Sequence, residues 1–170
     1  MTDPVPPGSE ATTTTPAAPS STAAQVEPPG FAIGVDGHFA IGESLIQANI
    51  GLRAELAIAP HHALVVRAGI GSVQWVESES DDPEYRELFA RVGYRVSAKH
   101  IYAGVELGRS VFKAYYPAMD GMPARDGNSF GGTTYTALVG WKLGPVDLGF
   151  DYTVPMKSFG IYLGAGYRSR

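Results

Sequence analysis

From Phe31 onward, apolar residues alternate with polar or very small residues in eight separate segments. Residues two apart share one face of a β-strand, so this period of two predicts strands that each have an apolar face and a polar face. The expected strands are residues 31–41, 48–58, 64–71, 88–96, 101–108, 134–142, 146–154 and 159–168. We therefore expect an all-β fold in which residues 30–170 form eight antiparallel strands.

The polar face of these strands is unusual because much of it is glycine. The chain contains 21 glycines but only four lysines, and most strand glycines fall on the polar face. Glycine weakens a strand that faces water, since it packs against nothing and loses more backbone entropy on folding. Inside a narrow eight-stranded barrel, small residues instead leave room for long side chains that cross the lumen. The glycines therefore favour an up-and-down barrel with its polar face inside.

The long side chains on the polar face are charged and nearly balanced, with six cations and five carboxylates. Arginine dominates, and its planar fork suits buried pairing with carboxylates, whereas lysine is typical of solvated faces. We predict an ion-pair network that fills the lumen and is formed by Asp36, Arg53, Glu55, Arg67, Arg91, Arg95, Glu106, Lys142, Asp147, Asp151 and Arg168.

The apolar face carries no charge through the middle of any strand, where one lysine or arginine in a bilayer would cost roughly 2–4 kcal/mol. Aromatic residues gather near the strand ends, as they do at the two lipid–water interfaces of membrane barrels. The predicted girdles are Phe31, Trp141 and Tyr167 near one rim, and Phe39, Trp75, Phe112, Tyr135, Tyr152 and Phe159 near the other. These features predict a transmembrane β-barrel, and a soluble lipocalin-like ligand-binding barrel with the apolar face inside is an alternative.

The connections between the strands also differ at the two ends. Those after the second, fourth and sixth strands are tight turns, whereas those after the third and fifth are long and polar. The fifth strand is followed by a loop expected over Ala114 to Phe130, which contains the turn signals Asp120-Gly121 and Asp126-Gly127-Asn128. Short turns lie on the periplasmic side of outer-membrane barrels, and an even strand number places both termini there.

The closing segment Gly160-Ile161-Tyr162-Leu163-Gly164-Ala165-Gly166-Tyr167-Arg168, together with the eight alternating strands and the charged lumen, resembles the small barrels of the outer membrane protein A and X type. The resemblance covers residues 31 to 170 and implies a bacterial outer-membrane location. Those families usually end on an aromatic residue that the assembly machinery reads, whereas Ser169 and Arg170 follow Tyr167 here.

Residues 1–29 are rich in proline, alanine, threonine and serine, and cannot bury enough apolar surface to fold. We expect a disordered periplasmic segment that serves as a spacer or as a docking segment for a partner. The first residues, Met1-Thr2-Asp3-Pro4, lack the charged and apolar regions of a secretory signal. Because export to an outer membrane requires one, we expect a signal peptide upstream of this sequence.

Residues that carry chemistry are sparse. The net charge of −4 provides no basic stripe for nucleic acid, and neither cysteines nor histidines with zinc-ligand spacing are present, so no metal or cofactor is predicted. The acidic run Glu77, Glu79, Asp81, Asp82 and Glu84 is expected to be a solvated loop, with cation binding as an alternative.

The alternative of a lipid A-modifying enzyme would draw on His38, Ser44 and Glu43 near the first loop. A nucleophilic serine needs an adjacent base that is itself oriented by a third group, and the sequence offers no such arrangement, so we assign no catalytic residue. We expect instead a monomeric, non-enzymatic outer-membrane protein with a structural, surface-interaction or narrow-pore role. Its expected partners are membrane lipid or lipopolysaccharide, and an extracellular or periplasmic protein.

Overall fold

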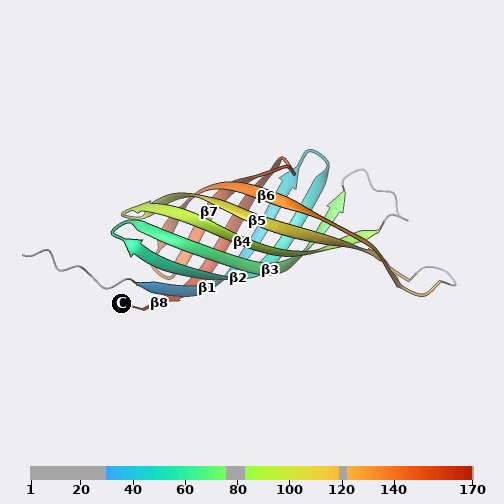
Figure 1. Cartoon of the computed structure of the whole chain (residues 1–170), viewed down its shortest axis with the longest axis horizontal. Helices are drawn as coiled ribbons and strands as arrows, with labels where there is room; N and C mark the ends of the chain where they lie inside the picture. The colour runs from blue at the N-terminus through green and yellow to red at the C-terminus, as the bar shows by residue number, and fades with distance from the viewer. Residues whose placement is uncertain (1–29, 76–82, 119–121, 170) are drawn as a thin grey trace, which may run out of the picture.

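A computed structural model of the chain describes residues 30–75, 83–118 and 122–169, without the side chains of Trp75 and Arg168. The predicted disordered segment 1–29 and most of the acidic run, residues 77–82, lie outside this range. Eight antiparallel strands close into a barrel in which each strand pairs with its sequence neighbours and β1 pairs with β8 (Figure 1). The strands are β1 (Phe31–Gly42), β2 (Leu45–Ala59), β3 (His62–Trp75), β4 (Glu84–Ala98), β5 (Ile101–Tyr116), β6 (Arg125–Leu143), β7 (Val146–Val154) and β8 (Ser158–Arg168).

The barrel is inverted relative to a water-soluble one, because its apolar face points outward. The side chains of Leu52 and Val92 are 69% and 53% exposed, whereas their sequence neighbours Arg53 and Arg91 are 6% and 5% exposed. Alternation along each strand extends this division around the ring, since successive side chains point to opposite faces. The predicted eight-stranded barrel with a polar interior is confirmed, and the lipocalin-like alternative is wrong because the apolar face is not the core.

Glycines on the inner face make room for the large side chains that cross the lumen. Gly140 and Gly149 lie opposite each other in the β6–β7 pairing. A Cβ atom at Gly149 would lie 2.4 Å from the ring of Tyr162, and one at Gly140 would lie 2.5 Å from the hydroxyl of Tyr102. These two tyrosine rings occupy the space that a larger residue would need, which explains why the polar face is rich in glycine.

Tight turns join β2 to β3, β4 to β5 and β6 to β7 at one end of the barrel, near the C-terminal end of β8 (Figure 1). His61, Lys99 and Gly144 within these turns have positive φ, a left-handed conformation that reverses the chain within two residues. The other four connections lie at the opposite end, which we call the loop end; those after β3 and β5 are long, and those after β1 and β7 are short.

The fifth and sixth strands are longer than the sequence predicted. β5 continues to Tyr116 and β6 begins at Arg125, so Asp126-Gly127-Asn128 lies within a strand rather than in a loop. Pairing with β5 continues through Tyr116↔Arg125 after a register shift near Lys113. Ladder hydrogen bonds and cross-strand contacts here outweigh the local turn signals, because β propensity depends strongly on the neighbouring strand.

No helix among the described residues is long and apolar enough to cross a membrane.

Candidate functional site: the filled lumen

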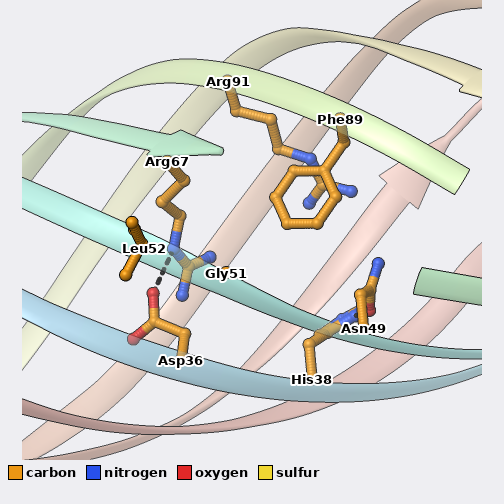
Figure 2. A pocket seen from close by; sticks show the side chains of 8 residues that line it. All are labelled: Asp36, His38, Asn49, Gly51, Leu52, Arg67, Phe89 and Arg91. Atoms are coloured by element: carbon orange, nitrogen blue, oxygen red, sulfur yellow. Dashed lines mark hydrogen bonds and ion pairs between the residues drawn. The ribbon is translucent and has the colours of Figure 1, made fainter. Parts of the chain in front are cut away.

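Two arginines converge on one aspartate in the middle of the lumen. Arg67 Nε donates a hydrogen bond of 2.8 Å to Asp36 Oδ2, which Figure 2 shows as a dashed line, and Arg53 Nη1 lies 3.4 Å from Asp36 Oδ1. Arg67 also reaches Glu106 on β5 at 3.5 Å, and Arg53 pairs with Asp147 on β7. All of these side chains are less than one-tenth exposed.

The network continues toward the tight-turn end. Arg95 Nη1 lies 3.1 Å from Glu55 Oε2 and 3.8 Å from Asp147 Oδ2, and Lys142 Nζ donates a hydrogen bond of 2.7 Å to Glu55 Oε1. These pairs and those around Asp36 join residues of the seven strands from β1 to β7. Removing one member of a buried pair leaves a charge without compensation and typically costs about 3–5 kcal/mol, so the network holds the strands in a defined arrangement.

Two members of the predicted network, Arg91 and Asp151, form no arginine–carboxylate pair with a described side chain. Arg91 is buried but forms no ion pair with a carboxylate in the described part of the chain, and its guanidinium lies 5.1 Å from the centre of the Phe89 ring. Asp151 contacts His38 Nε2 at 3.0 Å instead of an arginine. The side chain of Arg168 is not described.

A second polar cluster, which sequence reasoning missed, lies toward the loop end. Glu87 is 2% exposed and accepts hydrogen bonds from Gln47 and from Asn49 Nδ2, the latter at 2.9 Å. Asn49 Oδ1 also lies 2.8 Å from His38 Nδ1, which connects Glu87 through Asn49 and His38 to Asp151. Glu87 directly precedes the predicted start of the fourth strand, but the alternation through Arg91 and Arg95 already indicated that it faces inward.

Two tyrosines cross the lumen beside the ion pairs and were not assigned a role from the sequence. The hydroxyl groups of Tyr102 and Tyr162 are hydrogen bonded to each other, and both side chains are almost fully buried. Arg95 lies over the Tyr102 ring at 4.1 Å, and Arg67 lies over the Tyr162 ring at 4.7 Å. Contacts between a guanidinium and a ring face are favourable when both groups are shielded from water, so the tyrosines both fill space and stabilise the arginines.

Apolar side chains close the lumen at the loop end. Leu45, Val73 and Phe112 are each less than one-tenth exposed and pack together, with Tyr85 and Met156 against them. Phe112 was predicted in the outer girdle, and that prediction is wrong. Its even position on β5 places it on the same face as Tyr102 and Glu106, which point inward.

The other predicted girdle residues lie on the outside where their side chains are described. The predicted girdle residues with exposed side chains are Phe31, Phe39, Tyr135, Trp141, Phe159 and Tyr167. Tyr152 is partly covered by Phe159, whose ring centre lies 4.7 Å from its own. The side chain of Trp75 is not described.

Side chains fill most of the lumen, and among the described residues no grouping suggests catalysis. A cavity of about 20 Å³ beside Asp36, Arg67 and Phe89 has room for roughly one water molecule (Figure 2). His38 contacts Asn49 and Asp151, neither of which is a hydroxyl nucleophile, while Ser44 lies in the connection between β1 and β2. Within the described ranges, no three histidine, aspartate or glutamate side chains are grouped to hold a metal ion.

The fold is similar to that of solved outer-membrane barrels. Two structures of Ail, the attachment invasion locus protein of Yersinia pestis, match with TM-scores of 0.57 and 0.56 at 15% and 16% identity, and each match covers 83% of this chain and 97% of Ail. The second of these holds the heparin analogue sucrose octasulfate. The N-terminal β-barrel domain of Pseudomonas aeruginosa OprF matches with a TM-score of 0.50 at 8% identity, covering 81% of this chain and 97% of that domain.

No protein-family model matches the sequence, and neither does any curated protein. At these low identities the structural likeness establishes the fold alone. The expected resemblance to small eight-stranded outer-membrane barrels is thereby confirmed for the architecture.

Proposed function

We propose that this chain, which has the fold of the small outer-membrane barrels of the outer membrane protein A and X type, is a non-enzymatic scaffold that presents its β5–β6 hairpin at the bacterial surface for contact with a partner. In this proposal the barrel lies in the outer membrane with its tight turns and both termini in the periplasm, and residues 1–29 form a separate periplasmic segment. The apolar exterior and the turn-to-loop asymmetry support this orientation.

The observation that carries the proposal is the free edge of β6. β6 pairs with β7 only from Tyr135 to Leu143, whereas its pairing with β5 extends out to Arg125. Among the described residues, 125–134 therefore have a neighbouring strand on one side only. An exposed strand edge presents unpaired backbone N–H and C=O groups, which can add a strand from another chain.

The filled lumen argues against solute passage as the main role. Ion pairs and tyrosines occupy the middle of the barrel, and an apolar cluster closes the loop end. Eight strands enclose space for side chains rather than for a channel. The outer surface and the loop end remain available for interaction.

Adhesion of proteoliposomes tests the proposal. Lys113 and Ser129 are paired across β5 and β6, so replacing residues 114–128 with Asn-Gly closes a shorter hairpin that leaves the β6–β7 pairing intact and removes only Ala114 and Tyr115 from the β4–β5 pairing. The probes are immobilised heparin, chosen because the Ail structure holds a heparin analogue, and an epithelial-cell monolayer. We expect the full chain to adhere to at least one probe and the shortened chain to adhere several-fold less.

A variant that lacks residues 1–29 is the matched control and should adhere as well as the full chain, because this segment is proposed to lie on the other side of the membrane. Equal adhesion of the full and shortened chains, or adhesion of the full chain no greater than that of protein-free liposomes, would contradict the proposed surface role.

A further inference from the structure

The charged side chains that the structure describes on the outer face of the barrel lie in one region. Among the described strand residues, the outward-facing charged positions are Glu84, Arg86, Arg109, Lys113 and Asp126, all on β4–β6 and all toward the loop end. The outward positions of the remaining strands are uncharged wherever their side chains are described. We call Arg86, Arg109 and Lys113 the outer cation patch.

The depth of the patch can be estimated from the strand geometry. Ile101 pairs with Trp141 at the tight-turn rim, and Arg109 lies eight residues further along β5. At about 3.3 Å per residue and a tilt of about 40°, Arg109 lies roughly 20 Å along the barrel axis from that rim. Lys113, which pairs with Arg86, lies roughly 30 Å from it by the same estimate. The apolar band of such barrels is about 25 Å tall, so the patch spans the upper lipid–water interface.

The two arginines of the patch have no carboxylate partner among the described residues. Arg86 lies over the Tyr115 ring at 4.0 Å, and Arg109 forms no ion pair with any side chain that the structure describes. Lys113 is exposed and pairs with Asp126. Arg86 and Lys113 face each other directly across β4 and β5, an arrangement that is unfavourable for two like charges unless an anion lies near them.

An apolar groove of about 720 Å³ lies on the outer surface immediately below the patch. Leu107, the outward residue immediately before Arg109 on β5, lines the groove together with Val105 and Tyr135. The surface is hollow here because the small side chains of Val105 and Ala137 lie between the larger rings of Tyr94 and Tyr152 in one row across β4–β7.

We propose that the patch and the groove together bind a phosphorylated, acylated glycolipid of the outer leaflet, namely the lipid A portion of lipopolysaccharide. This inference rests on the proposed membrane location but does not depend on the adhesive role of the hairpin. The groove takes an acyl chain, and the patch binds the phosphates.

Charge complementarity favours this ligand over a lipid with a single charge. Guanidinium groups bind phosphate oxygens through two parallel hydrogen bonds, and they do so more strongly where lipid limits access of water. Arg109 and Arg86 lie on adjacent strands offset by four residues, or about 13 Å along the strand. Cations at two depths fit a headgroup with two separated phosphates. Glu84 lies two residues beyond Arg86 on the side away from the membrane, so it does not oppose the deeper phosphate.

The test compares thermal unfolding of the full chain in vesicles of phosphatidylcholine, phosphatidylcholine with bisphosphorylated lipid A, and phosphatidylcholine with an equal charge of phosphatidylglycerol. A ligand that binds only the folded protein raises the unfolding temperature. We expect lipid A to raise it more than phosphatidylglycerol does. Arg86→Gln with Arg109→Gln should weaken the apparent affinity for lipid A about tenfold or more, because two charge-assisted contacts are removed.

Further variants distinguish the contribution of the cations to lipid A binding from that of the groove. Arg109→Lys in the Arg86→Gln background should recover part of the lipid A effect, and Ala137→Phe, which fills the groove, should reduce it without changing any charge. Lys157→Gln is the matched control, since Lys157 is an exposed cation at the same end but outside the patch. It should behave as the unaltered chain.

Several results would overturn the inference: equal shifts with lipid A and phosphatidylglycerol, no loss in the double arginine variant, or the same protection from inorganic phosphate added to phosphatidylcholine vesicles. A chain that inserts into vesicles without responding to lipid A overturns this inference and leaves the surface role standing. A chain that never inserts overturns both.

Discussion

At the residue scale, the inner face of the barrel depends on the contrast between glycine and the largest side chains. Tyr162 is fully buried and fits because Gly149 on the neighbouring strand has no side chain. The same holds for Tyr102 and Gly140. A closely packed interior cannot absorb added volume without shifting side chains or backbone, so these glycines are steric requirements of the lumen rather than flexible points.

We therefore predict that Gly149→Val destabilises the folded barrel by about 1–3 kcal/mol, the usual cost of overpacking. The measurement is the urea dependence of unfolding in phosphatidylcholine vesicles, followed by tryptophan fluorescence. Gly132→Val is the matched control, because a Cβ atom at Gly132 meets nothing within 4 Å. Equal loss of stability in the two variants would show that the contact with Tyr162 is unimportant.

At the scale of one element, the single strand β5 faces the lumen on one side and the apolar exterior on the other, and it then continues into the hairpin beyond the barrel. Its inward face runs from Tyr102 through Glu106 to Phe112, and its outward face is apolar until Arg109. Beyond Lys113 the strand continues into the hairpin, where it pairs with the free-edged part of β6. The change from apolar to cationic residues on the outward face marks where lipid tails are expected to end.

This gradient predicts a depth-dependent cost for a charge placed on the outer face of β5. Val105→Arg, near the middle of the apolar band, should cost about 2–4 kcal/mol of unfolding free energy, whereas Val111→Arg should cost about 0–1 kcal/mol because it lies near the interface. Urea unfolding in phosphatidylcholine vesicles measures both. If the two substitutions cost the same, the apolar band has been placed wrongly.

At the scale of the whole molecule, the ion-pair network ties the strands together and seals the lumen with the same residues. Asp36, Arg53 and Asp147 join β1, β2 and β7 near the middle, and Arg95, Glu55 and Lys142 continue the network toward the turns. The apolar cluster at Leu45 and its neighbours closes the opposite end. The barrel is thus filled by two chemically different layers.

We predict that the protein inserted into planar bilayers shows no stable conductance steps, because ion pairs and tyrosine rings occupy the lumen and the cavity beside Asp36 has room for roughly one water molecule. A porin inserted under the same conditions serves as the positive control. Heat-dependent migration of the sample on a gel verifies that the protein is folded. Regular conductance steps from folded protein would contradict a sealed lumen and favour the narrow-pore role.

Strand number, strand order and the direction of each face were available from the sequence, because alternation is a local property that each segment carries by itself. The same alternation, together with glycine and arginine on one face, was enough to predict that the polar side is inside. The alternation also assigns Glu87, just before the fourth strand, and Phe112, on the fifth, to the lumen, although neither residue was predicted there.

Other features required the tertiary structure. Which carboxylate each arginine meets depends on the stagger between strands that are distant in sequence, so the pairing of Asp151 with His38 and the position of Arg91 beside Phe89 could not be read from composition. The extension of β6 through Asp126-Gly127-Asn128 depends on pairing with β5, which overrides a local turn signal. The outer groove forms where Val105 and Ala137 lie between Tyr94 and Tyr152, an arrangement set by the register of the β4–β5, β5–β6 and β6–β7 pairings.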